Sequence, residues 1–315
     1  MIHAGIDEAG YGPLLGPLVI GAAAFRLPDG PGPSLRERVK GIWCRASERG
    51  PRVSEAVPVD DSKEVHRRHG VPGLARGVAS AAAGMGRAPA TDLHDWLARF
   101  SDRPAEAFAN DPWFEAPRSE SIPRYAVPAG LRERMLLRGA EPVSLVVSPI
   151  VPAELNEAFE ATGNKARVLF LSTAALLVRV LEAFPGEDVS VTLDREGGRL
   201  DYAEYLADAF PWHDIREEAS APGEARYAFR EGGREVRLRF ATRGDGEDIA
   251  VGLASMAAKM TRELFMGRLN AWFLARQPGL KRTAGYVEDG RRFLVDAAPV
   301  LERERVDMGR LVRSR

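Results

Sequence analysis

The chain has 315 residues, 45% of them hydrophobic, which is enough for a sizeable core in one large domain or two ordinary ones. Lysine and arginine (44) nearly balance aspartate and glutamate (45), so no global field attracts a nucleic acid and any such binding needs a local patch. The single cysteine, Cys44, excludes an intrachain disulfide and a cysteine-based zinc site. Without a charged-then-apolar leader or an apolar run of about 18 residues, we expect a soluble, cytoplasmic protein.

The first predicted element is a hairpin with two adjacent carboxylates, Asp7 and Glu8, where an apolar run meets a glycine-rich turn. Residues 5–9 predict a buried strand, and residues 18–23 predict a second strand beside it. Because successive strand residues point to opposite faces, the two carboxylates cannot both simply face solvent. A buried charge there is costly unless it is compensated, and a divalent cation is a common compensator. The alternative is an exposed acidic turn in which glycines supply positive φ angles.

The next stretch predicts one helix and the start of another. Residues 34–48 predict a helix that a Gly-Pro pair ends, and residues 57–58 do not develop into a strand because the chain turns polar there. Asp61 and the serine after it provide a helix N-cap. His66 and His69 are expected on the surface of that helix, since no third ligand lies at metal spacing.

Residues 85–135 are the least patterned part of the chain. They contain several prolines together with Trp96, Trp113 and Phe114. We interpret this segment as an insertion that its aromatic side chains pack against the core, and not as an independent domain.

Beyond residue 140, predicted strands alternate with predicted helices. The strands are residues 143–148, 189–194 and 235–242, the last with the pattern of an exposed strand, and the helices are residues 152–160, 166–184, 202–210 and 249–274. Residues 302–315 predict a charged tail or a frayed helix. Interleaved strands and helices favour an α/β domain.

Four carboxylates share one property, which is that each ends a predicted strand or opens a turn beside one: Asp7, Glu8, Asp194 and Asp245. Ends of neighbouring strands converge at one edge of an α/β sheet. Carboxylate oxygens suit Mg²⁺ or Mn²⁺, and two such ions about 3.5–4 Å apart can support phosphodiester cleavage. The alternative is that Asp194 and Asp245 are ordinary turn residues, because aspartate is frequent in turns.

Several segments resemble the type 2 ribonucleases H, the ribonuclease HII family, and they occur in the family's order across nearly the whole chain. Residues 5–13 with Gly16-Pro17 are similar to the family's opening signature, and residues 61–63 to its next motif. Asp245, ten residues before Ser255, is similar to its aspartate-plus-helix motif, and Gly285-Tyr286 to its glycine-tyrosine pair. The resemblance is weakest over residues 85–135, which we treat as extra to the family.

The resemblance implies a ribonuclease H-like fold, a central mixed sheet flanked by helices, in one catalytic domain over residues 1–315 with a C-terminal helical part from about 249. It also implies endonucleolytic cleavage of the RNA strand of RNA–DNA hybrids by two Mg²⁺ or Mn²⁺ ions, which leaves 5′-phosphate and 3′-hydroxyl ends. Asp7, Glu8, Asp194 and Asp245 carry over as catalytic metal ligands. Asp248, the rival to Asp245, has the wrong spacing and is a good helix N-cap instead.

The matched segments also imply a substrate-binding set. Gly10 and Gly12 let backbone N–H groups approach a substrate, and a 2′-hydroxyl separates RNA from DNA. Lys63 is a candidate phosphate contact or an exposed surface lysine. Tyr286 resembles the family residue that stacks on a sugar, and its alternative is a core aromatic. The full predicted set is Gly10, Tyr11, Gly12, Ser62, Lys63, Ser255, Lys259 and Tyr286, while we expect Arg262 on a solvated helix face.

The chain departs from the family's pattern at four places, one of which is the flank of Asp194, residues 195–198, where the sequence is more acidic than expected. Tyr11 stands where the family usually has arginine, which bears on recognition of a single ribonucleotide embedded in DNA. Residues 249–252 lack the usual valine-proline pattern, and Glu263 replaces the usual aspartate. Two further functions remain open: a nuclease of the same architecture for another structured nucleic acid, and a non-catalytic member that binds nucleic acid or protein through residues 85–135.

Overall fold

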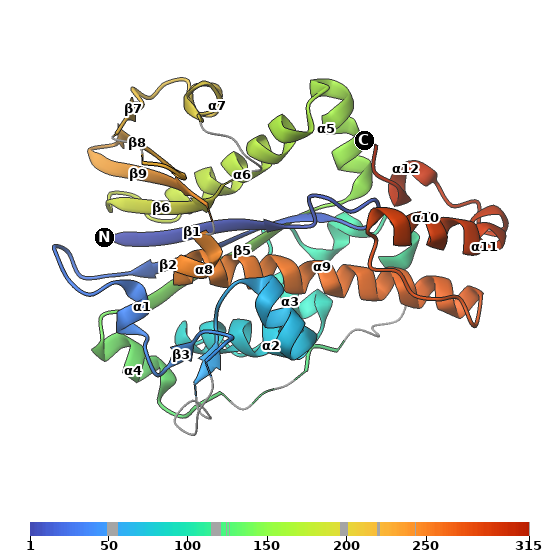
Figure 1. Ribbon diagram of the computed structural model, residues 1–315, viewed down its shortest axis with the longest axis horizontal. Coiled ribbons are helices and arrows are strands. Elements are labelled where there is room, and N and C mark those ends of the chain that lie inside the picture. Colours follow the sequence, from blue (N-terminus) through green and yellow to red (C-terminus); the bar gives the residue numbers. More distant parts are fainter. Residues whose placement is uncertain are drawn as a thin grey trace.

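The computed structural model describes residues 1–48, 56–114, 121–123, 125, 127–195, 201–218, 221–242 and 244–314, without the side chain of Asp245. A mixed seven-stranded sheet forms its centre, in the order β5-β2-β1-β6-β9-β8-β7 (Figure 1). The strands are β1 (Ile2–Ala9), β2 (Leu18–Arg26), β5 (Glu141–Ile150), β6 (Val189–Asp194), β7 (Arg216–Glu217), β8 (Glu224–Glu231) and β9 (Arg234–Ala241). The three central strands β1, β6 and β9 run parallel to one another, so their carboxyl ends meet at one edge.

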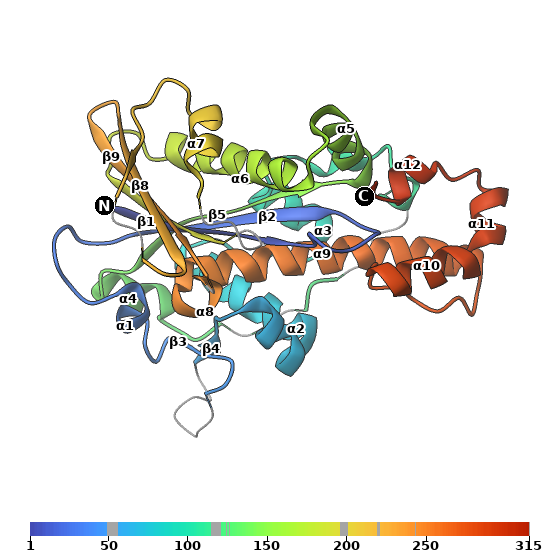
Figure 2. The same cartoon turned by 45° about the horizontal axis from the view of Figure 1, so that its top comes forward.

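Helices cover both faces of this sheet. In Figure 2, α9 and α2 lie below the sheet, while α5, α6 and α7 lie above it. The helices are α1 (Leu35–Arg38), α2 (Ser62–Gly84), α3 (Leu93–Phe100), α4 (Leu131–Leu137), α5 (Pro152–Thr162), α6 (Lys165–Glu182), α7 (Ala203–Ala209), α8 (Gly244–Glu247), α9 (Ile249–Arg276), α10 (Val287–Asp296), α11 (Ala298–Arg303) and α12 (Met308–Leu311). The expected mixed sheet flanked by helices, with a C-terminal helical part, is confirmed. None of the described helices is long and apolar enough to cross a membrane.

Two glycines allow α9 to lie directly on the sheet. A Cβ atom at Gly5 of β1 would come within 2.1 Å of the Val251 backbone nitrogen, and one at Gly21 of β2 within 2.3 Å of the Ala254 oxygen. Since real Cβ atoms do not approach backbone atoms this closely, only glycine permits the observed helix–sheet distance. This close packing carries α9 along the first hairpin, where the candidate site lies.

The region from residue 34 to residue 58 differs from its prediction. The expected helix over residues 34–48 stops after α1, because the chain turns at Gly41 with φ of 79°. Trp43–Cys44 (β3) then pairs with Val57–Pro58 (β4), so the second pair of residues does form a short strand. The buried Trp43 packs edge-on against Phe25 and donates a hydrogen bond to Ser80, which holds this small sheet against the core.

Two later predictions are also wrong. Strand β9, predicted as exposed, lies inside the sheet between β6 and β8, with Val236, Leu238 and Phe240 buried. Strand β8 was not predicted, and its pairing with β9 covers that edge. Residues 302–314 are neither a charged tail nor a single frayed helix: they include the end of α11 and the separate helix α12, and Arg313 is 7% exposed. The Arg313 guanidinium donates hydrogen bonds to backbone carbonyl oxygens inside the fold, and the charge pattern of the sequence does not predict these bonds.

The aromatic residues between 85 and 135 pack on the core as expected. Trp96 of α3 donates a hydrogen bond of 2.8 Å from Nε1 to Thr261 on α9. Phe114 lies with its ring centroid 4.8 Å from that of Phe265, also on α9. These contacts tie the segment to the helix that covers the hairpin. That the segment is extra to the family, and that residues 1–315 form one catalytic domain, stay predictions.

Candidate active site

The carboxyl ends of β1 and β6 bring two predicted site residues side by side. In their parallel pairing Ile6 lies opposite Leu193, so Asp7 and Asp194 follow at the same level. Glu8, the next residue of β1, feels the charge of Asp194: burial raises the pKa of the Glu8 carboxyl, and the nearby negative charge of Asp194 raises it further. The predicted convergence of the two strand ends is therefore observed in these residues.

Asp7 is buried, with 8% of its surface exposed. Its Oδ1 accepts a hydrogen bond of 2.7 Å from the Glu8 backbone N–H, which orients the carboxylate against its own strand end. The alternative of an exposed acidic turn does not hold for this residue.

Asp194 connects the strand ends to the loop that carries Asp245. Its Oδ1 accepts a hydrogen bond of 2.9 Å from the backbone N–H of Gly244, the first residue of α8. Burial raises the pKa of Asp194, although this hydrogen bond and the charge of Lys63 oppose the shift. The backbone of Asp245 directly follows Gly244, while its side chain lies outside the described part of the structure.

The carboxylates at the strand ends are the candidate ligands for the Mg²⁺ or Mn²⁺ that the resemblance implies. Among the described side chains, which leave out that of Asp245, no group of three or more histidines, cysteines, aspartates or glutamates could hold a metal ion. The chemistry of the strand-end carboxylates nevertheless fits a hard cation, because Glu8 and Asp194 are desolvated oxygen donors whose charges repel each other. A divalent cation between them would relieve that repulsion.

Lys63 is the cation that faces these carboxylates. Its charge lowers the pKa of both Glu8 and Asp194 against the effect of burial. The predicted cap holds it in place: Asp61 Oδ1 accepts a hydrogen bond of 2.7 Å from the Lys63 backbone N–H at the start of α2. Lys63 is thus exposed to solvent, and its charge acts on the carboxylates of Glu8 and Asp194.

The glycine-rich turn rests on two buried arginines that the sequence analysis did not assign to it. Arg262, expected on a solvated face, is 1% exposed, and a Cβ atom at Gly10 would lie 2.7 Å from its Nε. Gly10 has φ of 91°, a left-handed conformation that favours glycine. Arg313 donates hydrogen bonds to the carbonyl oxygens of Gly10 and Gly16. Burial lowers the pKa of both guanidinium groups, that of Arg313 to about 9.

The remaining predicted substrate contacts differ in their exposure to solvent. Tyr286 is 53% exposed, so it is not a core aromatic, and Arg262 lies 5.6 Å from its ring centroid. Gly12 is exposed on the turn. Lys259 forms an ion pair of 2.7 Å with Glu263 and is largely buried, so its predicted phosphate contact requires that pair to open. All of these substrate contacts stay predictions.

Asp248 is the N-cap of α9, as expected, with Oδ1 accepting a hydrogen bond of 2.9 Å from the Ala250 N–H. Its Oδ2 lies 2.8 Å from Nε2 of His3, which no sequence argument had linked to it. Burial would raise the pKa of Asp248, but the hydrogen bond and charge of His3 outweigh it and lower that pKa. Asp248 is therefore engaged away from the strand-end carboxylates.

Comparison with known proteins finds similar solved structures but no family. No family model and no curated protein matches the chain. It is similar to Archaeoglobus fulgidus ribonuclease HII, solved in a complex with PCNA, at 15% identity over 100% of this chain and 95% of that chain, with a TM-score of 0.42. It is similar to Pyrococcus horikoshii OT3 ribonuclease H2 at 14% identity, over 99% and 92%, with a TM-score of 0.42.

A third similar structure is Bst-RNase HIII in complex with Mn²⁺, at 15% identity over 99% of this chain and 66% of that chain, with a TM-score of 0.43. At these identities and TM-scores, the function of this chain has to be argued from its own residues. The three structures named above are those of a ribonuclease HII, a ribonuclease H2 and a ribonuclease HIII.

Proposed function

We propose that this protein is a metal-dependent endonuclease that cleaves the RNA strand of RNA–DNA hybrids. One observation carries the proposal: the buried Asp7 and the half-buried Glu8 at the end of β1 lie beside Asp194 at the end of β6. Asp194 in turn binds the backbone next to Asp245. A fold gains nothing in stability from carboxylates that repel one another in a desolvated place, so a bound cation is the simplest reason for the arrangement.

The residues that would hold Mg²⁺ or Mn²⁺ are Asp7, Glu8, Asp194 and Asp245. Two ions bound there would activate the attacking water and stabilise the leaving oxygen, giving 5′-phosphate and 3′-hydroxyl ends. The chain's own residues supply the rest: the Glu8 N–H orients the Asp7 carboxylate, and the Gly244 N–H orients Asp194. Lys63, whose charge acts on both Glu8 and Asp194, would contact the substrate phosphate.

Selection of RNA is assigned to the exposed side of the glycine-rich turn. The backbone at Gly12 can approach a ribose closely, because a Cβ atom there would meet no atom within 4 Å. The exposed Tyr286 ring can stack on a sugar near the same turn, since the Gly285 carbonyl accepts hydrogen bonds from the Leu14 and Leu15 N–H groups. A 2′-hydroxyl is the group that distinguishes RNA from DNA at such a site.

The test is cleavage of end-labelled substrates by the purified protein with Mg²⁺ or Mn²⁺. An RNA–DNA hybrid should be cut internally, while RNA duplex, DNA duplex and single-stranded RNA should not. Asp7→Asn, Glu8→Gln and Asp194→Asn should each lower the hybrid-cleavage rate by at least about a hundredfold, because each removes a charged ligand. Glu182→Gln, at an exposed carboxylate on α6, is the matched control and should keep the wild-type rate.

Other outcomes select the other functions. Cutting of branched DNA alone would favour a nuclease for a structured nucleic acid. Binding without cleavage of any substrate, unaffected by EDTA, would favour a non-catalytic member. A DNA duplex with one embedded ribonucleotide tests the effect of having Tyr11 where the resembled family usually has arginine. We expect this substrate to be cut more slowly than a continuous RNA–DNA hybrid. The cytoplasmic location stays a prediction.

A further inference from the structure

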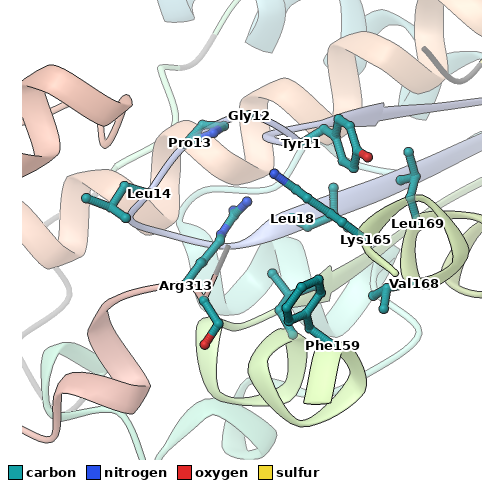
Figure 3. A pocket seen from close by; sticks show the side chains of 12 residues that line it. Tyr11, Gly12, Pro13, Leu14, Leu18, Phe159, Lys165, Val168, Leu169 and Arg313 are labelled. Atoms are coloured by element: carbon teal, nitrogen blue, oxygen red, sulfur yellow. The ribbon is translucent and has the colours of Figure 1, made fainter. Parts of the chain in front are cut away.

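Lys165 brings a cation from a distant element to the glycine-rich turn. It is the first residue of α6, and its Nζ lies 4.6 Å from the centroid of the Tyr11 ring. Figure 3 shows the Lys165 side chain extending from α6 across a hollow toward Gly12 and Pro13. Lys165 is itself exposed, so a ligand on the surface of the turn can reach its ammonium group.

The hollow between the turn and α6 is small, with a volume of about 40 Å³. Leu18, Phe159 and Leu169 form an apolar wall, and the cations Lys165 and Arg313 contribute to the lining. An apolar wall with a cationic rim suits an anionic group at the mouth of the hollow, and it suits a free metal cation poorly.

Two buried arginines make the turn more positive from below. Arg262 donates hydrogen bonds to the carbonyl oxygens of Leu15 and Ala284, while its Nε and Nη1 have no hydrogen-bond partner. Its Nη1 lies 3.9 Å from Glu263, whose carboxylate accepts a hydrogen bond from Lys259. Arg313 also donates to carbonyl oxygens of the turn. The carbonyl acceptors are neutral, and the single negative charge of Glu263 is shared between Arg262 and Lys259, so the turn keeps a net positive charge and attracts an anion.

The position of Lys165 in its helix supports the same conclusion. The N-terminus of a helix carries partial positive charge, which disfavours a lysine there and favours an anion. The first turn of the 18-residue helix α6 contains no acidic residue, and Asn164 caps it with hydrogen bonds from the Ala166 and Arg167 N–H groups. The Tyr11 ring, which stands where a turn arginine is usual in the resembled family, holds this cation at the rim.

We propose that Lys165, held on the Tyr11 ring, binds a backbone phosphate of the nucleic-acid strand that crosses the glycine-rich turn. It supplies from α6 the cation that the turn itself lacks at Tyr11. The inference rests on the proposed function, because the strand in question is the substrate of that site. Lys165 is accordingly a substrate-binding residue and sets affinity, and it takes no part in the bond cleavage.

The experiment measures binding of a fluorescent RNA–DNA hybrid in EDTA, so that no cleavage occurs. Lys165→Gln should weaken binding about fivefold or more and should lower the slope of log K against log salt by about 0.9, the contribution of one phosphate contact. Lys165→Arg should restore the affinity, because it keeps a positive charge at this position. Lys40→Gln is the control, since that exposed lysine follows α1, at the other end of the sheet from the C-terminal helices (Figure 1).

With metal present, Lys165→Gln should raise KM and leave kcat within about twofold, as expected for a contact made equally in the ground and transition states. An unchanged affinity and salt slope in Lys165→Gln would overturn the inference, even if the wild type cleaves hybrids. The expected binding change in a protein that cleaves nothing would instead overturn the proposed function and leave the phosphate contact standing. A lowered kcat at unchanged KM would also contradict the assignment.

Discussion

Ser255 of α9 donates a hydrogen bond of 2.8 Å to Ser62, the first residue of α2, and both hydroxyl groups are buried. The hydrogen bond joins α2 and α9, which are far apart in the sequence. It fixes the start of α2 relative to the helix that lies on the first hairpin. Because Lys63 follows Ser62, the serine pair sets where the lysine meets the charges of Glu8 and Asp194.

Breaking the serine pair should affect both stability and activity. Ser255→Ala removes the donor and leaves a buried hydroxyl at Ser62, which should cost about 1–2 kcal/mol of unfolding free energy. Hybrid cleavage should fall with it, because Lys63 loses a support. In urea unfolding, Ser62→Ala combined with Ser255→Ala should cost less than the sum of the single variants. Fully additive costs would show that the two hydroxyls do not stabilise each other.

Glycine at position 5 should be indispensable for folding. Gly5→Ala would place its Cβ against the backbone of α9 and should lower the unfolding free energy by at least about 3 kcal/mol, or prevent folding. Gly12→Ala is the matched control, because a Cβ there meets no atom within 4 Å, and it should change stability by less than about 0.5 kcal/mol. Equal melting temperatures of the two variants would contradict the described contact of α9 with β1.

Removal of metal should expose the repulsion among the strand-end carboxylates. Burial and the charge of Asp194 raise the pKa of Glu8, so the native state binds its proton more tightly than the unfolded state. Stability from this group is then present below its ordinary pKa of 4.5 and is lost as pH rises through the folded value. In EDTA at neutral pH, Glu8→Gln should therefore melt at a higher temperature than the wild type.

Addition of Mg²⁺ should reverse that order, since only the wild type keeps the full ligand set. Glu182→Gln should follow the wild type in both conditions. A wild-type melting temperature that neither Mg²⁺ nor Mn²⁺ changes would count against a metal site at these residues.

Arg36 should act as a positioning residue for the loop that carries Asp245. Its guanidinium Nη2 donates a hydrogen bond of 3.1 Å to the carbonyl oxygen of Gly246, and its Nε one of 3.4 Å to that of Glu247. Arg36→Ala should lower kcat about tenfold with little change in hybrid binding, because a misplaced ligand slows chemistry more than association. Arg38→Ala is the control, since that side chain donates to the carbonyl oxygens of Pro33 and Arg138 instead. Equal kcat values in the two variants would contradict this role.

Asp111 should make stability depend on pH. Burial raises its pKa to about 6, although Arg310 lies 3.5 Å from its carboxylate. Because the native pKa of Asp111 is raised, its contribution to the unfolding free energy is fully present below the ordinary aspartate pKa of 3.8. That contribution is lost as the pH rises through about 6. Asp111→Asn should thus be the more stable protein at pH 7.5, by on the order of 2 kcal/mol, and should lose that advantage near pH 4. Parallel pH profiles of the two proteins would refute this assignment.

Local sequence patterns were sufficient for the first hairpin, for β6 and for α9. Alternating or continuous apolar runs bounded by glycines and caps predicted these elements, and Asp61 and Asp248 cap α2 and α9 as expected. The same patterns failed at β8 and at residues 43–44. In the latter case, pairing with a distant segment and burial of Trp43 decided the conformation.

The sequence by itself determined which carboxylates end strands and which glycines open the turn, because these depend on neighbours along the chain. Only the tertiary structure decided that Arg262 and Arg313 lie beneath that turn and that Lys165 reaches its rim. Each of these side chains comes from a helix or a terminus that is remote from the turn in sequence. The charged residues around each of them predict a solvent-exposed position. Burial against backbone carbonyls and an aromatic ring, which no local pattern encodes, gave the cations their places beside the Asp7-Glu8 hairpin.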